Sequence, residues 1–243
     1  MNPADALAIL GLTAFAATVQ ATAGFGFSLV LVPLLVLVIG PKETVVVANV
    51  LSTALEAALL VRVHPHVDWR LGSKLFSGAL IGMPFGLLAL IWLSPKVLQI
   101  VIAVTVVVFT ILLMRGVRLQ RAGKLGDFGA GLVSGLLNTS TSMSGPPVVI
   151  YLQGSGVARA AFRATLLAYF AAISAIAVGL LAASGQFDRE TGLAAVVAIP
   201  ALAVGAVLGN ALHHRVPEDR FRQLVYAILF FSAGSAIVSA LTR

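Results

Sequence analysis

Glycines and polar residues interrupt two apolar stretches of this sequence, and their chemistry suits an anion. The first interruption is Gly24-Phe25-Gly26, followed by Ser28; the second is Ser144-Gly145-Pro146-Pro147, preceded by Asn138-Thr139-Ser140-Thr141-Ser142. A helix that restarts after such a break directs free N–H groups and the positive end of its dipole into the gap. Hydroxyl groups and the Asn138 amide can replace part of an anion's hydration. The two breaks are therefore predicted to hold a small anion between them.

The alternative for such small residues is that they only allow helices to pack closely. Close packing is the interpretation preferred for two later pairs, Gly82 with Gly86 and Gly205 with Gly209. For the two breaks a site is preferred, because unpaired backbone groups inside lipid are tolerated only where protein or water surrounds them.

A polar stripe marks the third apolar segment. Asn49, Ser52, Thr53 and Glu56 follow the spacing i, i+3, i+4 and i+7, which places them on one helical face. Glu56 lies about 9 Å along the helix axis from Arg62, so its ionised form is costly in lipid. Two interpretations stay open: Glu56 couples transport to a proton, or it reaches the interface and pairs with a loop arginine.

The predicted site combines these residues with Arg163, which lies at the start of the segment 164–183. Arg163 either attracts anions or marks the inner interface. Glu56 is the predicted coupling residue. The candidate substrate-binding residues are Gly24, Phe25, Gly26, Ser28, Asn49, Asn138, Thr139, Ser140, Ser142, Ser144, Gly145 and Arg163.

Residues for catalysis are few. The histidines, His64, His66, His213 and His214, fall in predicted loops, where solvated interfacial side chains are expected. The sequence has no cysteine, so thiolate metal sites, thiol nucleophiles and disulfides are excluded. No nucleophile or zinc-protease motif appears. We therefore expect no catalytic residues, no metal, no cofactor and no enzymatic activity.

The elements that position the site must be membrane helices. Apolar residues make up 59% of the 243 residues and charged residues only 10%, with a mean hydropathy of +1.03. At about 20 residues per span, about eight to ten helical segments fit the chain. The net charge of +7 lies in short loops, which argues against nucleic-acid binding. No basic region precedes the first apolar segment, so a cleaved signal peptide is not expected.

The apolar segments fall into two similar halves, predicted as 1–119 and 126–243, joined by a basic linker at 115–125. Each half opens with a broken or re-entrant hairpin, and the glycine pairs described above recur later in each. The predicted segments are 4–22, 25–40, 44–61, 75–93 and 97–114 in the first half, and 128–143, 146–153, 164–183, 193–212 and 224–241 in the second.

Loop charges predict how the halves are related. If each hairpin returns to its starting side, the loops at 62–74, 115–124, 159–163 and 215–222 hold twelve Lys and Arg on one side. Four remain on the other side: Lys42, Lys96, Arg189 and Arg243. The positive-inside rule then gives inverted-topology repeats, an N-terminus outside and a multi-pass protein of the plasma (inner) membrane. Parallel repeats of four full spans remain the alternative.

Several of these motifs resemble the sulfite exporter TauE/SafE family over nearly the whole chain. The residues that carry the resemblance are Gly24-Phe25-Gly26 with Pro33, the glycine-rich segment 128–136, the block 144–152 and Arg163-Ala164-Thr165. The resemblance implies transport of small sulfur-containing anions such as sulfite, sulfoacetate or related organosulfonates, in several cases outward. Family members usually have more glycines in both hairpins; here Phe27-Ser28 and the polar run replace several of them.

The combined prediction is an all-α, polytopic membrane transporter that works by alternating access. Its expected partners are a small anion, a coupling proton or sodium ion, the lipid bilayer and a second copy of the chain in a homodimer. Alternatives are a passive anion channel, a transporter of an unrelated small anion, and a membrane-embedded enzyme or assembly factor.

Overall fold

The computed structural model describes residues 3–117, 123–154, 156–213 and 218–242. All regular elements in these residues are helical. The first half contains α1 (Pro3–Ala23), α2 (Phe27–Ile39), α3 (Pro41–Val63), the 3-10 turn η1 (His64–His66), α4 (Trp69–Trp92) and α5 (Pro95–Met114). The second contains α6 (Gly123–Thr141), α7 (Gly145–Gln153), α8 (Arg159–Ala183), α9 (Arg189–His213) and α10 (Glu218–Thr242).

The helix order follows the predicted segments, and local sequence explains several boundaries. Pro41 and Pro95 stand at the first position of α3 and α5, where a missing N–H costs nothing. The Asp68 carboxylate caps α4 by accepting from the Leu71 N–H at 3.0 Å. The Ser94 hydroxyl caps α5 in the same way.

Six helices of the described chain are long and apolar enough to cross a membrane: α1, α3, α4, α5, α8 and α9. By contrast, α2 has 13 residues and α7 has nine. At 1.5 Å per residue they extend about 20 Å and about 14 Å, less than the roughly 30 Å hydrocarbon core. Each is therefore too short to cross the hydrocarbon core by itself.

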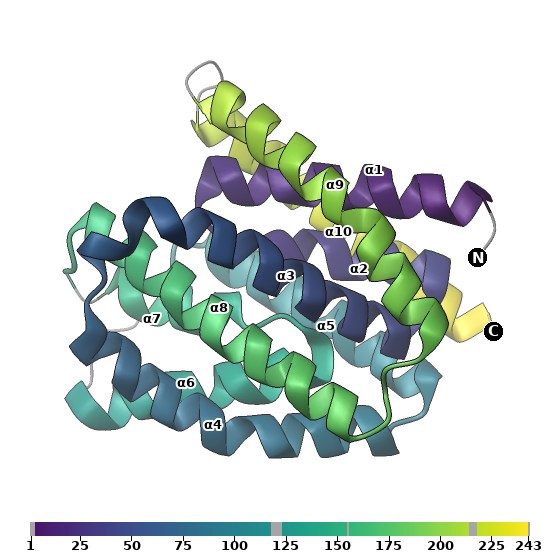
Figure 1. Ribbon diagram of the computed structural model, residues 1–243, viewed down its shortest axis with the longest axis horizontal. Helices are drawn as coiled ribbons and strands as arrows, with labels where there is room; N and C mark the ends of the chain where they lie inside the picture. The colour runs from purple at the N-terminus through teal and green to yellow at the C-terminus, as the bar shows by residue number, and fades with distance from the viewer. Residues whose placement is uncertain (1–2, 118–122, 155, 214–217, 243) are drawn as a thin grey trace.

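Two glycine-lined helix pairs lie at opposite edges of the molecule. In Figure 1, α1 and α9 lie together at the top, α4 and α6 at the bottom, and α3 and α8 between them. A Cβ atom on Gly82 or Gly86 of α4 would overlap a carbonyl oxygen of α6, and one on Gly205 of α9 would overlap the carbonyl oxygen of Ala14. A Cβ on Gly209 would lie 2.6 Å from the Thr18 carbonyl oxygen. These four glycines have the close helix packing that the sequence predicts.

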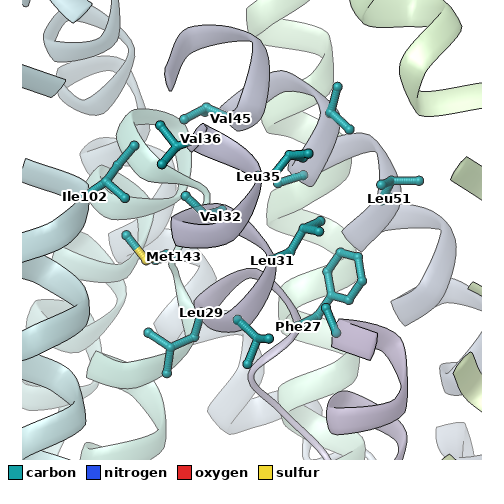
Figure 2. Close-up of a cluster of buried hydrophobic side chains, with 14 of the residues drawn as sticks. Phe27, Leu29, Leu31, Val32, Leu35, Val36, Val45, Leu51, Ile102 and Met143 are labelled. Atoms are coloured by element: carbon teal, nitrogen blue, oxygen red, sulfur yellow. The ribbon is translucent and has the colours of Figure 1, made fainter. Parts of the chain in front are cut away.

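The hydrophobic core surrounds the short helix α2. Figure 2 shows Val32 and Val36 of α2 near Ile102 of α5, while Met143, from the segment between α6 and α7, points toward α2. Because Leu29 to Val32 are all buried, this part of α2 is enclosed by protein on every face. Lipid-facing surface is instead supplied by the outer helices, where Trp92 of α4 and Phe231 of α10 are 76% and 78% exposed.

Candidate functional site

The first break is closed by one glutamine side chain. After α1 ends, Gly24 and Gly26 adopt φ angles of 85° and 105°, which strongly favour glycine, and α2 begins at Phe27. The Gly24 N–H donates to the backbone carbonyl of Gln20 at 2.7 Å, and the Phe27 N–H donates to the side-chain oxygen of Gln20, Oε1, at 2.7 Å. Gln20 therefore binds both sides of the turn and holds the start of α2 in place.

The second break has a related turn, but the helix that follows it has fewer backbone N–H donors in its first turn. Ser142 has a φ of 60°, and its N–H donates to the Asn138 carbonyl at 2.8 Å before α7 begins at Gly145. Pro146 and Pro147 occupy the next two positions of α7 and carry no N–H. The expectation of free N–H groups at both restarting helices therefore applies mainly to α2, while α7 contributes its dipole and the N–H of Gly145.

The two breaks meet, as the sequence predicts. Ser28 Oγ, in the first turn of α2, lies 3.3 Å from Ser142 Oγ and 2.9 Å from Ser52 Oγ of α3. A cavity opens where they converge, lined by Gln20, Phe25, Gly26, Phe27, Ser28, Leu29, Glu56, Ser142, Met143, Ser144, Gly145, Pro146 and Phe170.

The cavity volume is about 20 Å³, room for little more than one water molecule. The cavity in this structure is therefore too small for a guest much larger than water.

Glu56 faces the same cavity from α3. It is 5% exposed, and its Oε2 accepts from Ser174 Oγ of α8 at 3.4 Å. Within the described residues, no lysine or arginine lies at ion-pair distance from Glu56. The polar stripe of α3 does face protein, since Asn49 and Ser52 are buried with Glu56. In the part of the chain that the structure describes, Glu56 therefore forms no pair with a loop arginine.

Two predicted amides hold helices together outside the cavity lining. Asn49 Nδ2 donates to the carbonyls of Val45 at 2.9 Å and Asn138 at 3.3 Å. Asn138 Nδ2 donates to the Ile173 carbonyl at 3.1 Å, joining α6 to α8. Both side chains are fully buried, and neither lines the cavity.

Most of the polar run also points elsewhere. Thr139 Oγ1 donates to the Met83 carbonyl of α4 at 2.6 Å, while Ser140 and Thr141 donate to carbonyls one turn earlier in α6. Of the five residues, only Ser142 lines the cavity. Serine and threonine hydroxyls in a helix readily bond to the i−4 carbonyl, which removes them from the solvent or a guest.

Arg163 and Gly24 lie beside the first break without lining the cavity. A Cβ on Gly24 would lie 3.6 Å from Arg163 Cδ, and Arg163 Nη2 donates to the Ala21 carbonyl at 3.5 Å. The guanidinium group thus approaches the C-terminal end of α1, where the helix dipole is negative. Seven predicted residues come together at the cavity: Phe25, Gly26, Ser28, Glu56, Ser142, Ser144 and Gly145.

Gln20 is the one polar residue in the described cavity lining that was not predicted from the sequence. It is a single amide in an apolar helix, four residues before the left-handed Gly24. Asn138 stands at the same distance before Ser142, and that equivalence was the available signal. Without the turn geometry, an isolated glutamine is not distinguishable from a packing residue.

Among the described residues, no histidine lines this cavity. His64 and His66 form the exposed turn η1, His213 ends α9 instead of lying in a loop, and His214 lies outside the described residues. The part of the chain that the structure describes contains no group of three His, Cys, Asp or Glu suited to a metal ion.

Comparison with known proteins identifies the family. The sequence profile of the family described as "Sulfite exporter TauE/SafE" matches residues 9–236, almost the whole chain. The chain belongs to the sulfite exporter TauE/SafE family. It is therefore a multi-pass membrane transporter and not an enzyme.

Two relatives are similar to this TauE/SafE chain. It is 24% identical over 230 residues to the "Probable sulfite/organosulfonate exporter TauE" of Cupriavidus necator, which covers 92% of this chain and 90% of that protein. It is 34% identical over 116 residues to the "Probable inner membrane transporter protein TsaS" of Comamonas testosteroni, covering 47% and 48% respectively. No solved structure matches the chain significantly.

Proposed function

We propose that this chain is a secondary transporter that exports small sulfur-containing anions such as sulfite, sulfoacetate or organosulfonates across the inner membrane. The observation that carries the proposal is the convergence of two helix breaks on one buried polar cavity. The starts of α2 and α7 both lie at this cavity, so their dipoles favour negative charge there. The names of the two relatives, a probable sulfite/organosulfonate exporter and a probable inner membrane transporter, support the proposed substrate class and the proposed membrane.

The proposed mechanism is alternating access by two inverted halves. Their packing supports it, because the first helix of each half contacts the fourth helix of the other: α1 with α9, and α6 with α4. In Figure 1, α1 starts at the right, where the N-terminus is marked, whereas α6 starts at the left.

Residue numbering also supports related halves. Glu56 and Ser174, hydrogen-bonded across α3 and α8, are 118 residues apart. The same separation relates Gln20 to Asn138, and the left-handed Gly24 to the left-handed Ser142.

Movement must then open the cavity to each side in turn. The closed cavity is too small for a sulfonate group, so binding requires the breaks to move apart. Close α1–α9 and α4–α6 packing would let each pair move as a rigid body. The bonds of Ser28 to Ser52 and Ser142 cross between the breaks and would break and re-form during the cycle.

Glu56 is the proposed coupling residue. Its carboxyl group lies in the cavity, so a negative charge on it would repel an anionic substrate at close range. Neutralisation by a proton removes that repulsion and lets the anion enter. Arg163 and Tyr169 are the titratable groups of the neighbouring helix α8 on this part of the molecule, and among the described residues neither forms an ion pair or a hydrogen bond with Glu56.

The test is efflux of labelled sulfite from proteoliposomes that contain the full chain. Ser144→Leu fills the cavity, and Arg163→Ala removes the cation beside the first break; we expect both to lose transport. Val133→Leu, at an exposed position of the same helix that ends at the second break, is the matched control and should transport normally. Wild-type flux in both test variants would remove the proposed site.

A passive anion channel is the second candidate, favoured by the polar lining alone. A channel would conduct sulfite at a rate independent of proton or sodium gradients. A transporter of the proposed kind would accumulate the anion against its gradient when a coupling gradient is applied.

A further inference from the structure

A buried carboxyl group outside the cavity joins three helices. Asp127, near the start of α6, is fully buried, and its Oδ2 pairs with Lys74 Nζ of α4 at 3.5 Å. Its Oδ1 accepts from the Tyr151 hydroxyl of α7 at 2.8 Å, and the same hydroxyl lies 3.2 Å from the Gly123 carbonyl oxygen. Lys74, Asp127 and Tyr151 together form a polar latch that connects the α4–α6 pair to the short helix α7.

The bonds of the latch depend on how α7 is placed. A carboxylate withdrawn from water is unfavourable unless a cation and hydrogen bonds compensate for its lost hydration. For Asp127, the cation comes from α4 and one hydrogen bond comes from α7. Moving α7 away from α6 would remove that hydrogen bond, so the latch favours the arrangement in which the two helices are in contact.

Helix α7 connects the latch to the cavity. It has nine residues and begins at Gly145, which lines the cavity. Tyr151 follows six positions later, about 9 Å along the helix axis. Between them, Val148 and Val149 are fully buried in a hydrophobic cluster shared with α4 and α8. Because so short a helix moves as one unit, bonds that hold Tyr151 also hold the second break.

The latch lies toward one side of the membrane. In Figure 1, α7 and the starts of α4 and α6 lie together at the left. The contact between Tyr151 and Gly123 brings the end of the α6–α7 hairpin back to the helix end where the hairpin began. Lys74 and the start of α6 adjoin the basic loops at 62–74 and 115–124, so under the proposed topology the latch is on the inner side of the cavity.

The first half has apolar residues at the positions equivalent to Asp127 and Tyr151. Two of the residue pairs that relate the halves are separated by 118 positions, as described above. The same separation places Ile9 of α1 at the position of Asp127, and Pro33 of α2 at the position of Tyr151. Neither side chain can form an ion pair or donate a hydrogen bond.

The lysine also has an apolar counterpart. Gly82 of α4 and Gly205 of α9 are equivalent, because each packs against a carbonyl oxygen of the first helix of the other half. Lys74 stands eight residues before Gly82, and Val197 stands eight residues before Gly205. Under the inverted topology, the region equivalent to the latch faces the outer side and is held by apolar packing alone.

We infer that the polar latch is the inner gate of the transport cycle: its bonds hold α7 against the α4–α6 pair while the inner side is closed, and they break when the cavity opens inward. Asp127 and Tyr151 are positioning residues, since neither lines the cavity. The inference rests on the proposed transport function and adds an asymmetry to it. Inward opening breaks an ion pair and a hydrogen bond, whereas outward opening separates apolar surfaces.

The first experiment measures access to the cavity from each side. Because the chain has no cysteine, Ser144→Cys places a single thiol in the cavity lining. Its reaction rate with an impermeant thiosulfonate is measured in right-side-out and inside-out vesicles. Adding Tyr151→Phe, which keeps the ring but removes the bond to Asp127, should raise the rate from the inside at least about tenfold, the ratio for one hydrogen bond to a charged group.

The rate from the outside should not rise in this variant. A faster reaction from both sides would indicate general loosening of the fold and would overturn the inference. A faster reaction from the outside alone would also overturn it.

A second variant tests the ion pair. Asp127→Asn keeps an oxygen that can accept from Tyr151 but removes the charge that pairs with Lys74, and it should also raise the inside rate about tenfold or more. Arg70→Met is the matched control, because Arg70 lies one turn before Lys74 in α4 and is exposed. It should leave both rates unchanged. Wild-type inside rates in both latch variants would refute the gate.

Sulfite efflux from the same vesicles separates this inference from the proposed function. If the wild-type chain moved no sulfite while the latch variants still changed the inside rate, the proposed substrate would be wrong and the gate would stand. If sulfite transport were normal and the latch variants changed neither rate, the gate alone would be wrong.

Discussion

Glu56 of α3 and Gln20 of α1 face one small cavity, where the Gln20 side chain interacts with the Glu56 carboxyl group. An anion in this cavity would therefore meet both the carboxyl group and the amide. A hydrogen bond from the amide can hold an anion there only if the carboxyl group is neutral. Repulsion between the anion and an ionised carboxylate in a low-dielectric site outweighs one hydrogen bond. At the residue scale, the state of Glu56 controls whether the cavity binds its guest.

Glu56→Gln should separate binding from coupling. The amide resembles the protonated carboxyl group in shape and charge, so exchange of sulfite between the two sides should continue at near the wild-type rate. Accumulation driven by a proton gradient should fall at least about tenfold, because the variant cannot carry a proton. Proteoliposome assays with and without an imposed gradient measure both. Gradient-driven accumulation at the wild-type rate would exclude Glu56 as the coupling residue.

A second residue-scale prediction concerns Asp188, which lies outside the membrane segments. Hydrogen bonds from the Thr191 hydroxyl and from the Thr191 N–H, the latter at 2.7 Å, hold the pKa of the Asp188 carboxyl below its ordinary value. A lowered pKa in the folded state stabilises the protein above the unfolded-state pKa, about 3.9 for Asp, and this stabilisation is lost as pH falls through the folded-state pKa.

Asp188→Ala should therefore lower the thermal midpoint at pH 7, with a smaller difference from wild type below about pH 4. Melting of both proteins in detergent across this pH range provides the measurement. A difference that is the same at every pH would mean that the carboxylate charge does not contribute to the cap of α9.

At the scale of the element, the last four residues of α6 and Ser142, which follows it, are five consecutive polar residues that contact several different neighbours. Successive residues of a helix are rotated by about 100°, so a run of five cannot face one cavity. Thr139 bonds to α4, Asn138 bonds to α8 and only Ser142 faces the site. The run was correctly expected to avoid lipid, since its members are buried, but four of its five members were also predicted to line the site.

The α4–α6 contact supplies an element-scale prediction. A methyl group on Gly82 would meet the backbone of Leu132, so Gly82→Ala should push the two helices apart and cost about 1–3 kcal/mol of stability. Gly179→Ala is the matched control: Gly179 is also in a helix, and a Cβ there meets nothing within 4 Å. Thermal melting in detergent should show a clear loss for Gly82→Ala and none for the control. Equal stability would mean that α4 and α6 are not tightly packed.

At the scale of the whole molecule, the topology proposal requires loops on opposite sides of the membrane. The absence of native cysteine makes single-cysteine labelling direct. Ser94→Cys and Ser184→Cys, in the α4–α5 and α8–α9 connections, should react with an impermeant thiol reagent from outside intact cells. Ser73→Cys, near the start of α4, should react only after the membrane is opened. Labelling of all three from one side would contradict the inverted arrangement.

The sequence by itself determined that this is a helical membrane protein, which segments are helices, and where two of them break. These properties depend on local composition: hydropathy sets the spans, and glycine with proline sets the breaks. Motifs that are local in the chain also carried the family resemblance, which the profile match confirmed.

Only the tertiary structure decided which side chains share the cavity. Gln20 and Ser142 are 122 positions apart in the chain yet line the same space, while Asn49 and Asn138 bind to backbone instead. Likewise the buried Asp127 bonds to Tyr151 and pairs with Lys74 of α4, which no spacing rule indicates. The physical reason is that the helical period determines on which face of its helix a residue lies, but not which residue of another helix it contacts. That contact depends on how segments distant in the sequence pack together.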